Sequence, residues 1–597
     1  MNETKACQSC KQDFTIESED FRFYERIKVP PPTFCPFCRL QRRFSWRNER
    51  GLYYRKCDLC QKKIIAMYPT GVEYPVYCRE CWLSDNWDPL DYGQDYDFKK
   101  PFLVQFKELL LRVPQISSQV ANSVNCEYAN QITDCKNCYL ITSGKNNEDC
   151  AYSYRLHDSK NVLDSFLSLR AENIYESVDV TDSAQIYFSE DCIDSLGARF
   201  SYDVRGSQNC FMSSNLRNGS YVFRNERISK EEYLEKIKEV DTGSYSKLKS
   251  YLEEFEKLKL SSLHKYSNKK NTVNFTGHSA SNSKDCYHCF NIANDENCRY
   301  CTLLNNARDC MDINNGCCQM ELCYECSTAG VNTSGLLLSS DVWPEVNNLT
   351  YCSSCKNGAS YLFGCVSMRS SKYCVLNKQY SEAEYRELVS KIRKHMDDMP
   401  YVDSRGIIYK YGEFFPTELS LFPYADSAAQ DYIPLDKEEI VGLGFIWRDP
   451  EDKPVAITVD SEAIPDHIKD VPDSILGEVL ECVHRKSCSK EHCAGGFKIT
   501  DFELRFYRKN NIALPRLCPN CRHYQRFKKI NPPKLWHRAC ACVGRKSQAP
   551  NSKSQTYRNT TEHFHGEDPC PNEFETSYAP NRPEIVYCEQ CYNAEVV

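Results

Sequence analysis

Cysteine pairs of the form Cys-x2-Cys gather at both ends of this 597-residue chain. Zinc takes four thiolates in a tetrahedron, and one Cys-x2-Cys turn presents two sulfurs to the same side of an ion. Two such turns therefore complete one structural site. The N-terminal pairs are Cys7/Cys10, Cys35/Cys38, Cys57/Cys60 and Cys78/Cys81. Chain order predicts that the first pair joins the second and the third joins the fourth, although an interleaved pairing, first with third, is also compatible with the spacing.

The C-terminal end repeats this pattern. A shift of 483 residues places Cys10 on Cys493 and Cys35-Pro-x-Cys38 on Cys518-Pro-x-Cys521. After an insertion, the motif Val76-Tyr77-Cys78-x2-Cys81 recurs as Val586-Tyr587-Cys588-x2-Cys591. These matches indicate an internal duplication. They predict metal ligands at Cys488, Cys493, Cys518, Cys521, Cys540, Cys542, Cys588 and Cys591.

Two ligands of the second copy are less well determined by the spacing. We prefer Cys488 to Cys482 or His492 as the partner of Cys493. Direct alignment places Val543 on Cys60, so the neighbouring Cys542 is the expected substitute, and Cys570 is expected to be spare. With two sites at each end, the sequence predicts about four Zn²⁺ ions.

The compartment decides whether cysteines bind metal or form disulfides. The chain has 37 cysteines, and such density indicates disulfides in a secreted protein but metal in a reducing compartment. Residues 1–5 lack the apolar core of a signal peptide, and no stretch approaches the roughly 20 apolar residues of a membrane helix. We therefore expect a cytoplasmic protein that binds metal and has no membrane partner.

Basic and aromatic residues follow the second Cys-x2-Cys pair of each copy, although the formal net charge of the whole chain is -7. Basic side chains neutralise phosphates and aromatic rings stack on bases, so this mixture predicts contact with RNA, including ribosomal RNA, or with DNA. The candidate residues are Arg39, Arg42, Arg43, Trp46, Arg47 and Arg50 in the first copy, and Arg522, Arg526, Lys528, Lys529, Trp536 and Arg538 in the second.

A different interpretation of these residues competes with nucleic-acid binding. A four-thiolate zinc site carries a net charge of about -2, which neighbouring arginines offset, and aromatic rings between two zinc sites form the core of a ribbon. The zinc sites would then be purely structural, and the protein would be a protein–protein interaction scaffold.

An enzyme is the least favoured interpretation. Each four-cysteine site is closed, whereas catalytic zinc keeps a position open for water. The sequence has no His-Glu-x-x-His or P-loop motif. Some β-helix proteins cleave polysaccharides, but Asp158, Asp164 and Glu176 are scattered across the repeat without an evident cluster. We therefore expect a non-enzymatic protein.

The middle of the chain follows a 12-residue period. Every twelfth residue from Cys126 to Val222 is apolar or small. The residue three positions after each of these is serine in most cases. Such columns are typical of a solenoid in which each coil stacks on the previous one, and short apolar triplets between polar turns indicate β-strands. Bulky residues such as Tyr152 and Phe166 favour two 12-residue units per coil. A second block begins at Cys286, slips by one residue at Cys323 and is interrupted near residues 331–350.

The repeat also bears on the middle cysteines. Pairs such as Cys286/Cys289 and Cys298/Cys301 resemble zinc turns, but the first block fills the same columns with residues that do not bind metal. Because free cysteine behaves as a small buried hydrophobe, we expect interior ladders of cysteine rather than further metal or redox sites.

These patterns predict a mainly β fold in which duplicated zinc-ribbon modules flank two right-handed β-solenoid blocks, similar to parallel β-helices. Each block ends in Ser-x-x-Glu, a capping box that opens a covering helix. The expected segments are an N-terminal ribbon module (1–92), a helical connector (93–125), two solenoid blocks with capping helices (126–268 and 269–400), a small mixed connector (401–480) and a C-terminal ribbon module (481–597).

Three motifs carry a resemblance to known sequences. They are Cys35-Pro-x-Cys38-Arg39-x-Gln41-Arg42-Arg43, Val76-Tyr77-Cys78-x2-Cys81-Trp82 and Asn377-Lys378-Gln379-Tyr380-Ser381-x2-Glu384-Tyr385. The chain resembles uncharacterised cysteine-rich zinc-ribbon proteins predicted in bacteria of the candidate phyla radiation. The resemblance covers most of the chain and implies a bacterial cytoplasmic protein with the zinc pairing given above. It implies no activity.

Overall fold

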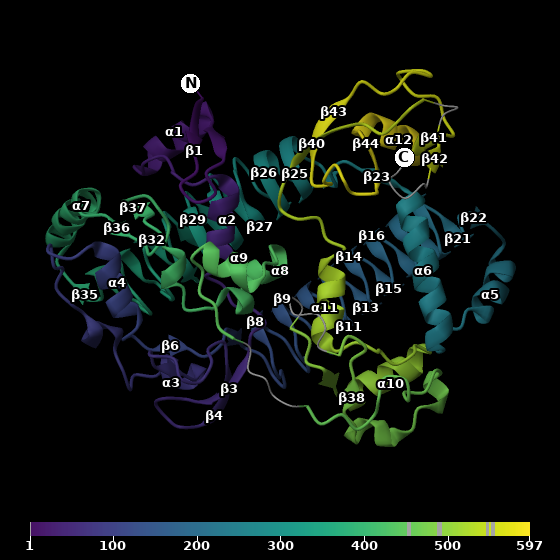
Figure 1. The fold of residues 1–597 in the computed structure, drawn as a ribbon, viewed down its shortest axis with the longest axis horizontal. Helices are drawn as coiled ribbons and strands as arrows, with labels where there is room; N and C mark the ends of the chain where they lie inside the picture. The colour runs from purple at the N-terminus through teal and green to yellow at the C-terminus, as the bar shows by residue number, and fades with distance from the viewer. Residues whose placement is uncertain (1, 450–454, 486–491, 545–547, 551–555) are drawn as a thin grey trace. The chain divides into compact units, whose positions relative to one another are not determined.

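The computed structural model describes residues 2–449, 455–485, 492–544, 548–550 and 556–597. The chain forms two compact units, and each is built from segments that are distant in sequence (Figure 1). Unit 1 comprises residues 1–119, 267–449 and 532–535; unit 2 comprises residues 120–266, 450–531 and 536–597. The N-terminal ribbon module therefore shares a unit with the second repeat block, and most of the C-terminal ribbon module shares a unit with the first.

The first repeat block (residues 120–227) is a stack of strands in unit 2 that pair in parallel, except for the last strand, which pairs antiparallel with its neighbour. Among the described residues it forms a nine-stranded sheet, β20-β18-β16-β14-β12-β10-β9-β8-β7, and a seven-stranded sheet, β11-β13-β15-β17-β19-β21-β22. The strands are β7 (Val120–Ala121), β8 (Asn130–Thr133), β9 (Thr142–Lys145), β10 (Tyr154–His157), β11 (Lys160–Leu163), β12 (Phe166–Leu169), β13 (Glu172–Tyr175), β14 (Val178–Thr181), β15 (Ala184–Tyr187), β16 (Glu190–Ile193), β17 (Leu196–Arg199), β18 (Tyr202–Arg205), β19 (Gln208–Phe211), β20 (Ser214–Arg217), β21 (Ser220–Phe223) and β22 (Glu226–Arg227).

The strand register gives the length of one coil. Val162 pairs with Ile174, which pairs with Ile186, so each residue lies beside the residue 12 positions later. One coil therefore holds one 12-residue unit, and the prediction of two units per coil is wrong. The rings that suggested a wider coil do not lie inside it: Tyr152 and Tyr175 project outward and are buried with residues of the C-terminal ribbon module.

A three-residue pattern explains how 12 residues close a coil. Asn161, Asp164, Leu167 and Arg170 all have positive φ, between 48° and 53°, so the chain bends at every third residue. Asparagine and aspartate tolerate this left-handed conformation better than most residues. The residue after each bend points inward, which gives four interior positions per coil. In one coil these are Val162, Ser165, Ser168 and Ala171, all buried.

The second repeat block (residues 269–379) belongs to unit 1 and forms a twelve-stranded sheet among the described residues. Its strands are β24 (Lys269–Lys270), β25 (Val273–Ser281), β26 (Lys284–Ala293), β27 (Thr302–Arg308), β28 (Met311–Glu321), β29 (Tyr324–Gly330), β30 (Thr333–Ser334), β31 (Ser340–Val342), β32 (Asn347–Thr350), β33 (Ser360–Phe363), β34 (Lys372–Val375) and β35 (Lys378–Gln379). The predicted interruption at residues 331–350 is wrong, because β30 to β32 continue the sheet with a 13-residue register, as in Ser327↔Ser340.

Cysteines line the interior of the second block. Cys289 is fully buried, and its Sγ lies 3.4 Å from the carbonyl oxygen of Tyr287 and 3.5 Å from that of Cys298. In the first block Ser177 Oγ makes the same two contacts, at 2.8 Å and 3.4 Å, to the carbonyls two residues before it and nine after it. Cysteine and serine are thus equivalent in this column, which supports the interior-ladder prediction.

Helices follow both blocks. Ser381 and Glu384 form a complete capping box at the start of α7 (Glu382–Asp398), while Ser229 caps α5 (Lys230–Glu239) through the N–H of Glu232. In the described part of the chain, the remaining α-helices outside the ribbon modules are α4 (Phe102–Leu110), α6 (Tyr245–Ser261), α8 (Ala428–Tyr432) and α9 (Lys437–Gly442). Within the described part of the chain, no helix has both the length and the apolar composition needed to span a membrane.

The two ribbon modules share one plan of hairpins and short helices. The N-terminal module contains β1 (Glu3–Ala6), β2 (Asp13–Ile16), α1 (Ser18–Ile27), α2 (Pro36–Phe44), β3 (Tyr53–Lys56), β4 (Lys63–Ala66), β5 (Val76–Tyr77) and α3 (Arg79–Leu83). The C-terminal module contains β38 (Leu480–Glu481), β39 (Gly496–Phe497), α10 (Asp501–Asn510), α11 (Pro519–Phe527), β40 (Trp536–Ala539), β41 (Gln548–Pro550), β42 (Thr556–Arg558), β43 (Glu573–Thr576), β44 (Ile585–Tyr587) and α12 (Glu589–Val596). The duplication seen in the sequence is thus a duplication of structure.

Candidate metal centres

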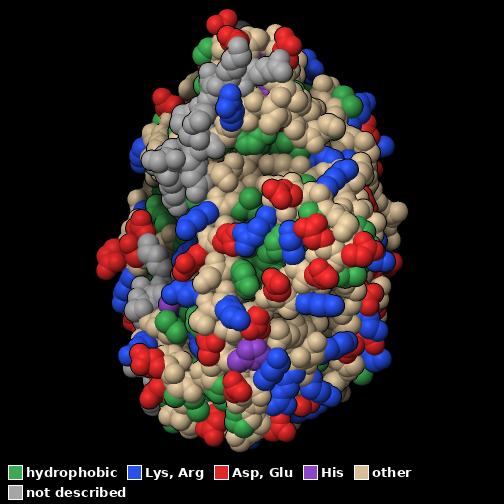
Figure 2. Space-filling model, turned by 90° about the vertical axis from the view of Figure 1, so that its right-hand side faces the viewer, with side chains coloured by type: hydrophobic (Ala, Val, Ile, Leu, Met, Phe, Trp, Pro, Cys, Tyr) green, Lys and Arg blue, Asp and Glu red, His purple; other side chains and the backbone are tan. Residues whose placement is uncertain are grey.

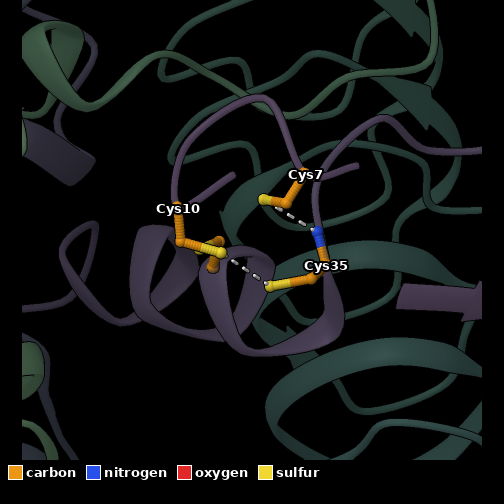
Figure 3. Close-up of side chains that lie close together, drawn as sticks. Cys7, Cys10 and Cys35 are labelled. Atoms are coloured by element: carbon orange, nitrogen blue, oxygen red, sulfur yellow. Dashed lines mark hydrogen bonds between the residues drawn. The ribbon is translucent and has the colours of Figure 1, made fainter. Parts of the chain in front are cut away.

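The first candidate centre is formed by Cys7, Cys10, Cys35 and Cys38, whose sulfurs all lie within 4.8 Å of one another. Cys7 and Cys10 stand on the turn between β1 and β2, and Cys35 is the N-cap residue of α2 (Figure 3). The backbone N–H of Cys35 donates to Cys7 Sγ at 3.3 Å, and Cys10 Sγ lies 3.8 Å from Cys35 Sγ. The first pair therefore joins the second, as chain order predicts.

The second centre repeats this construction. Cys57 and Cys60 stand on the turn between β3 and β4, and Cys78 is the N-cap residue of α3. The N–H of Cys78 donates to Cys57 Sγ at 3.2 Å, and Cys60 Sγ lies 3.9 Å from Cys78 Sγ. Burial opposes ionisation of Cys57, but hydrogen bonds from the backbone of Cys60 and Cys78 bring its pKa down to about 7. A thiol of lowered pKa is suited to bind metal, because the thiolate is the ligand.

The third centre differs from the expectation in one ligand. It consists of Cys482, Cys493, Cys518 and Cys521, and the N–H of Cys518 donates to Cys482 Sγ at 3.3 Å. Cys482 thus takes the place of Cys7, although eight more residues separate it from Cys493 than separate Cys7 from Cys10. Cys488, the ligand preferred from spacing, lies outside the described residues. The lengthened turn removed the Cys-x2-Cys spacing that would have revealed Cys482.

The fourth centre corrects two predictions. It consists of Cys540, Cys570, Cys588 and Cys591, so Cys570 is not spare and Cys542 does not replace Cys60. Strand pairing explains the assignment: β40 pairs with β43 as β3 pairs with β4, and both Cys60 and Cys570 stand three residues before the second strand. This register is visible only once β40 and β43 are paired, so spacing along the sequence does not identify Cys570. Its Sγ lies 3.9 Å from Cys588 Sγ.

The sulfur positions fit a tetrahedral ion. Four sulfurs at about 2.3 Å from zinc are about 3.8 Å from one another. The Sγ–Sγ distances given above for the first, second and fourth centres are 3.8 to 3.9 Å, and Cys518 Sγ lies 4.0 Å from Cys493 Sγ. Each of the four cysteine sets could therefore hold a metal ion whose four coordination positions are all filled by protein sulfurs.

The arginines of α2 do not lie on an open surface. Arg39, Arg42 and Arg43 are at most 2% exposed, and they face two buried carboxylates of the second repeat block. Arg39 Nη2 lies 2.8 Å from Asp312 Oδ2, and Arg42 Nη2 lies 3.1 Å from Glu325 Oε2. Arg43 Nη1 lies 3.1 Å from an oxygen of each carboxylate. The helix that carries a metal ligand is thus locked onto the coils by buried ion pairs.

Unit 2 repeats the same contact. Arg522, on α11, pairs with Asp164 of the first repeat block, and Arg526 Nη1 lies 3.0 Å from oxygens of both Asp164 and Glu176. The ring of Tyr152 lies under the Arg522 guanidinium at 4.7 Å, just as Tyr300 lies 5.4 Å from that of Arg39. The duplication therefore includes the contact between each ribbon module and its coils.

These placements contradict the predicted nucleic-acid contacts of seven residues. Arg39, Arg42, Arg43, Trp46, Arg47, Arg522 and Arg526 are all buried. Their side chains cannot meet phosphates or bases because carboxylates and aromatic rings of the same unit already surround them. Of the others, Lys528 is exposed, while Arg50, Lys529, Trp536 and Arg538 are half-buried. Lys529 pairs with Glu190 at 3.3 Å.

Comparison with known proteins assigns no activity to these centres, because no protein-family model matches the chain and no curated protein matches its sequence.

Proposed function

We propose that this protein is a non-enzymatic zinc-dependent scaffold. Zinc holds each ribbon module in the shape that docks onto a β-solenoid, and the solenoids present a repetitive surface to a partner protein. The observation that carries this proposal is the burial of the α2 and α11 arginines against solenoid carboxylates, which uses the most basic part of each ribbon module for internal contacts.

The first metal centre and the ion pairs between α2 and the second repeat block are linked through the N-terminus of α2. Cys35 begins α2 and is a ligand of the first centre, and Arg39 follows it by about one helical turn. An ion bound by Cys35 and Cys38 therefore fixes the first turn of the helix from which the arginines project. We propose zinc as the ion and a reducing compartment, the cytoplasm, as the location, since the thiolates must remain reduced to bind it.

Exposed ladders on the coils supply the surface for a partner. Lys136 Nζ lies 3.1 Å from Glu148 Oε1, and Lys160 Nζ lies 3.0 Å from Glu148 Oε2, so charges of opposite sign alternate from coil to coil. Basic and acidic side chains are also interspersed on the face shown in Figure 2. Solenoids commonly bind partners along such extended surfaces. Alternating charge favours a protein partner over a phosphate backbone, which requires a basic surface.

Zinc removal tests whether the metal holds the ribbon modules in the shape that docks onto the solenoids. The full chain, purified under reducing conditions, is compared before and after treatment with a strong chelator by peptide-resolved hydrogen exchange. We expect faster exchange in residues 36–44 and in the facing coils around residues 312–325. Unchanged exchange after complete zinc release would contradict a structural role for the metal.

The partner class is tested by an RNA titration on the purified chain and by cross-linking in a cell extract. Labelled single-stranded RNA is titrated at 50 and 200 mM KCl, and we expect no binding at micromolar protein. Tight RNA binding that weakens by about a thousandfold between these salts would replace the scaffold with a nucleic-acid function. In nuclease-treated extract of the native host, cross-links from Lys136 or Lys160 to one protein would support the scaffold.

A further inference from the structure

The fourth centre differs from its N-terminal counterpart by a long insertion. Cys57 and Cys60 are three residues apart, whereas Cys540 and Cys570, which occupy the equivalent positions, are 30 residues apart. The insertion begins and ends at two ligands of one metal site, which places its first and last residues next to that site. It contributes Cys542, His563 and His565, and the counterpart turn of the N-terminal module has no equivalent residues.

These inserted residues gather around one ligand of the fourth centre. The ligand atoms of Cys542, His563, His565 and Cys591 all lie within 4.8 Å of one another. Cys542 Sγ lies 3.5 Å from His563 Nδ1, and Cys591 Sγ lies 3.4 Å from His565 Nε2. Two imidazoles and two thiolates form a common tetrahedral zinc set.

The outer nitrogen of each histidine has a partner that fixes the ring. His563 Nε2 lies 2.9 Å from Glu595 Oε1, and both side chains are fully buried. Glu595 is itself held by the N–H groups of Thr560 and Thr561 at 3.0 Å. His565 Nδ1 lies 2.6 Å from the carbonyl oxygen of Asp568. Metal-binding histidines characteristically donate their second nitrogen to such a carboxylate or carbonyl, which leaves the first nitrogen free for the ion.

Cys542 is similarly supported. Asn559 Nδ2 donates to Cys542 Sγ at 3.2 Å and to the carbonyl oxygen of Gly544 at 2.8 Å, while Asn559 Oδ1 accepts from Tyr587 at 2.7 Å. The buried amide is therefore held with its N–H group pointing at the sulfur. A hydrogen bond of this kind stabilises a thiolate, the form of cysteine that binds metal.

We propose that the C-terminal ribbon module holds two zinc ions bridged by the Cys591 thiolate. One ion is bound by Cys540, Cys570, Cys588 and Cys591, and the second by Cys542, His563, His565 and Cys591. The proposal extends the zinc-binding function proposed above by a fifth ion. Five thiolates, two neutral imidazoles and two Zn²⁺ carry a net charge of -1, which is less than the charge of about -2 on a four-thiolate site. The second ion thus reduces the net negative charge that the protein has to bury at this cluster.

Metal counting on the full chain tests the fifth ion. Zinc is measured per folded chain in the native protein, in the double variant His563→Ala/His565→Ala and in the control variant His537→Ala, whose ring is exposed on β40 of the same module. We expect five ions in the native protein, four in the double variant and five in the control. Four ions in all three proteins would overturn the bridged centre and leave the four-thiolate sites intact. One ion or none in the native protein would overturn the proposed function itself.

Cobalt substitution provides a second test, and its main measurement uses the native chain alone. In the fully Co²⁺-loaded native chain, a shared thiolate couples two adjacent ions magnetically, so we expect the electron paramagnetic resonance intensity to fall below that of five isolated ions. Glu595→Gln, which keeps the shape of the side chain that orients His563, should weaken only the last ion to bind. Spin intensity that rises in proportion to cobalt up to full loading would overturn the bridge.

Discussion

The docking contact of unit 1 predicts a large effect of one neutralising substitution, Glu325→Gln. The Glu325 side chain is fully buried, and it accepts hydrogen bonds from Arg42, Arg43 and the backbone N–H of Phe414. Three arginines in this cluster face three carboxylates, of Asp312, Glu325 and Glu413, so the buried charge balances. The glutamine keeps the shape of the side chain but leaves one positive charge uncompensated.

The size of the effect follows from the burial of the cluster. Removing one partner of a buried ion pair costs about 3–5 kcal/mol, because the remaining charge has lost both water and its counter-charge. The duplicated chain offers a matched comparison at Glu176, which faces Arg526 in unit 2 but is 22% exposed. This side chain is less buried than that of Glu325, and Asp164 still pairs with Arg526 after Glu176→Gln. We expect a cost of about 1 kcal/mol there.

Native-state hydrogen exchange on the zinc-loaded chain measures both costs. Peptides covering α2 and β29 report on unit 1, and peptides covering α11 and β13 report on unit 2. Each variant therefore serves as the control for the other, and zinc content is measured on both to separate loss of metal from loss of the ion pair. A change below about 1 kcal/mol in Glu325→Gln, or equal changes in the two variants, would refute the argument that buried charge holds the ribbon module on the coils.

Three further predictions concern single cysteines and one carboxyl group. Cys38→Ser should release one zinc ion and increase exchange throughout α2, as measured by metal analysis and hydrogen exchange; retention of every ion would contradict its assignment as a ligand. Cys289→Ser should keep all the zinc and cost less than about 1.5 kcal/mol in urea unfolding, because Ser177 makes the same hydrogen bonds in the first block. Burial, with repulsion from Asp191, raises the pKa of Asp179 to about 7. The folded state therefore binds this proton more tightly than the unfolded state, and the stability it contributes is lost as pH rises from about 4 through 7. Relative to the native chain, Asp179→Asn should gain up to about 4 kcal/mol of stability as the pH rises from 4 to 8, because a pKa raised from about 4 to about 7 corresponds to that free energy. A stability difference that stays constant over this pH range would contradict this.

The sequence predicted what depends on local spacing. The eight N-terminal ligands, the duplication and the 12-residue columns all follow from residues at fixed separations, and the structure places them accordingly. Cys482 and Cys570 escaped prediction because insertions separated each of them from its partner ligand. Only the hairpin register, which is a property of the folded backbone, shows that Cys570 stands where Cys60 stands.

The basic residues were misinterpreted for a different reason, which is that their partners are distant in sequence. Arg522 and Arg526 are four residues apart, about one helical turn, or 6 Å. Asp164 and Glu176 are 12 residues apart, so they occupy adjacent coils, about 4.8 Å apart. The two spacings match closely enough for a helix laid across the stack to pair with successive coils. Carboxylates that seem scattered along the repeat therefore form a column once it is coiled.

The same match of spacings occurs in both units. A helix with basic residues one turn apart can pair with acidic residues one coil apart. In unit 1, Arg39 pairs with Asp312 and Arg43 pairs with Glu325 in this way. Since each ribbon module and its coils are separated in sequence by segments of the other unit, neither unit is complete until most of the chain has been made. Zinc binding by the N-terminal module can precede this step, whereas burial of its arginines must await the second repeat block.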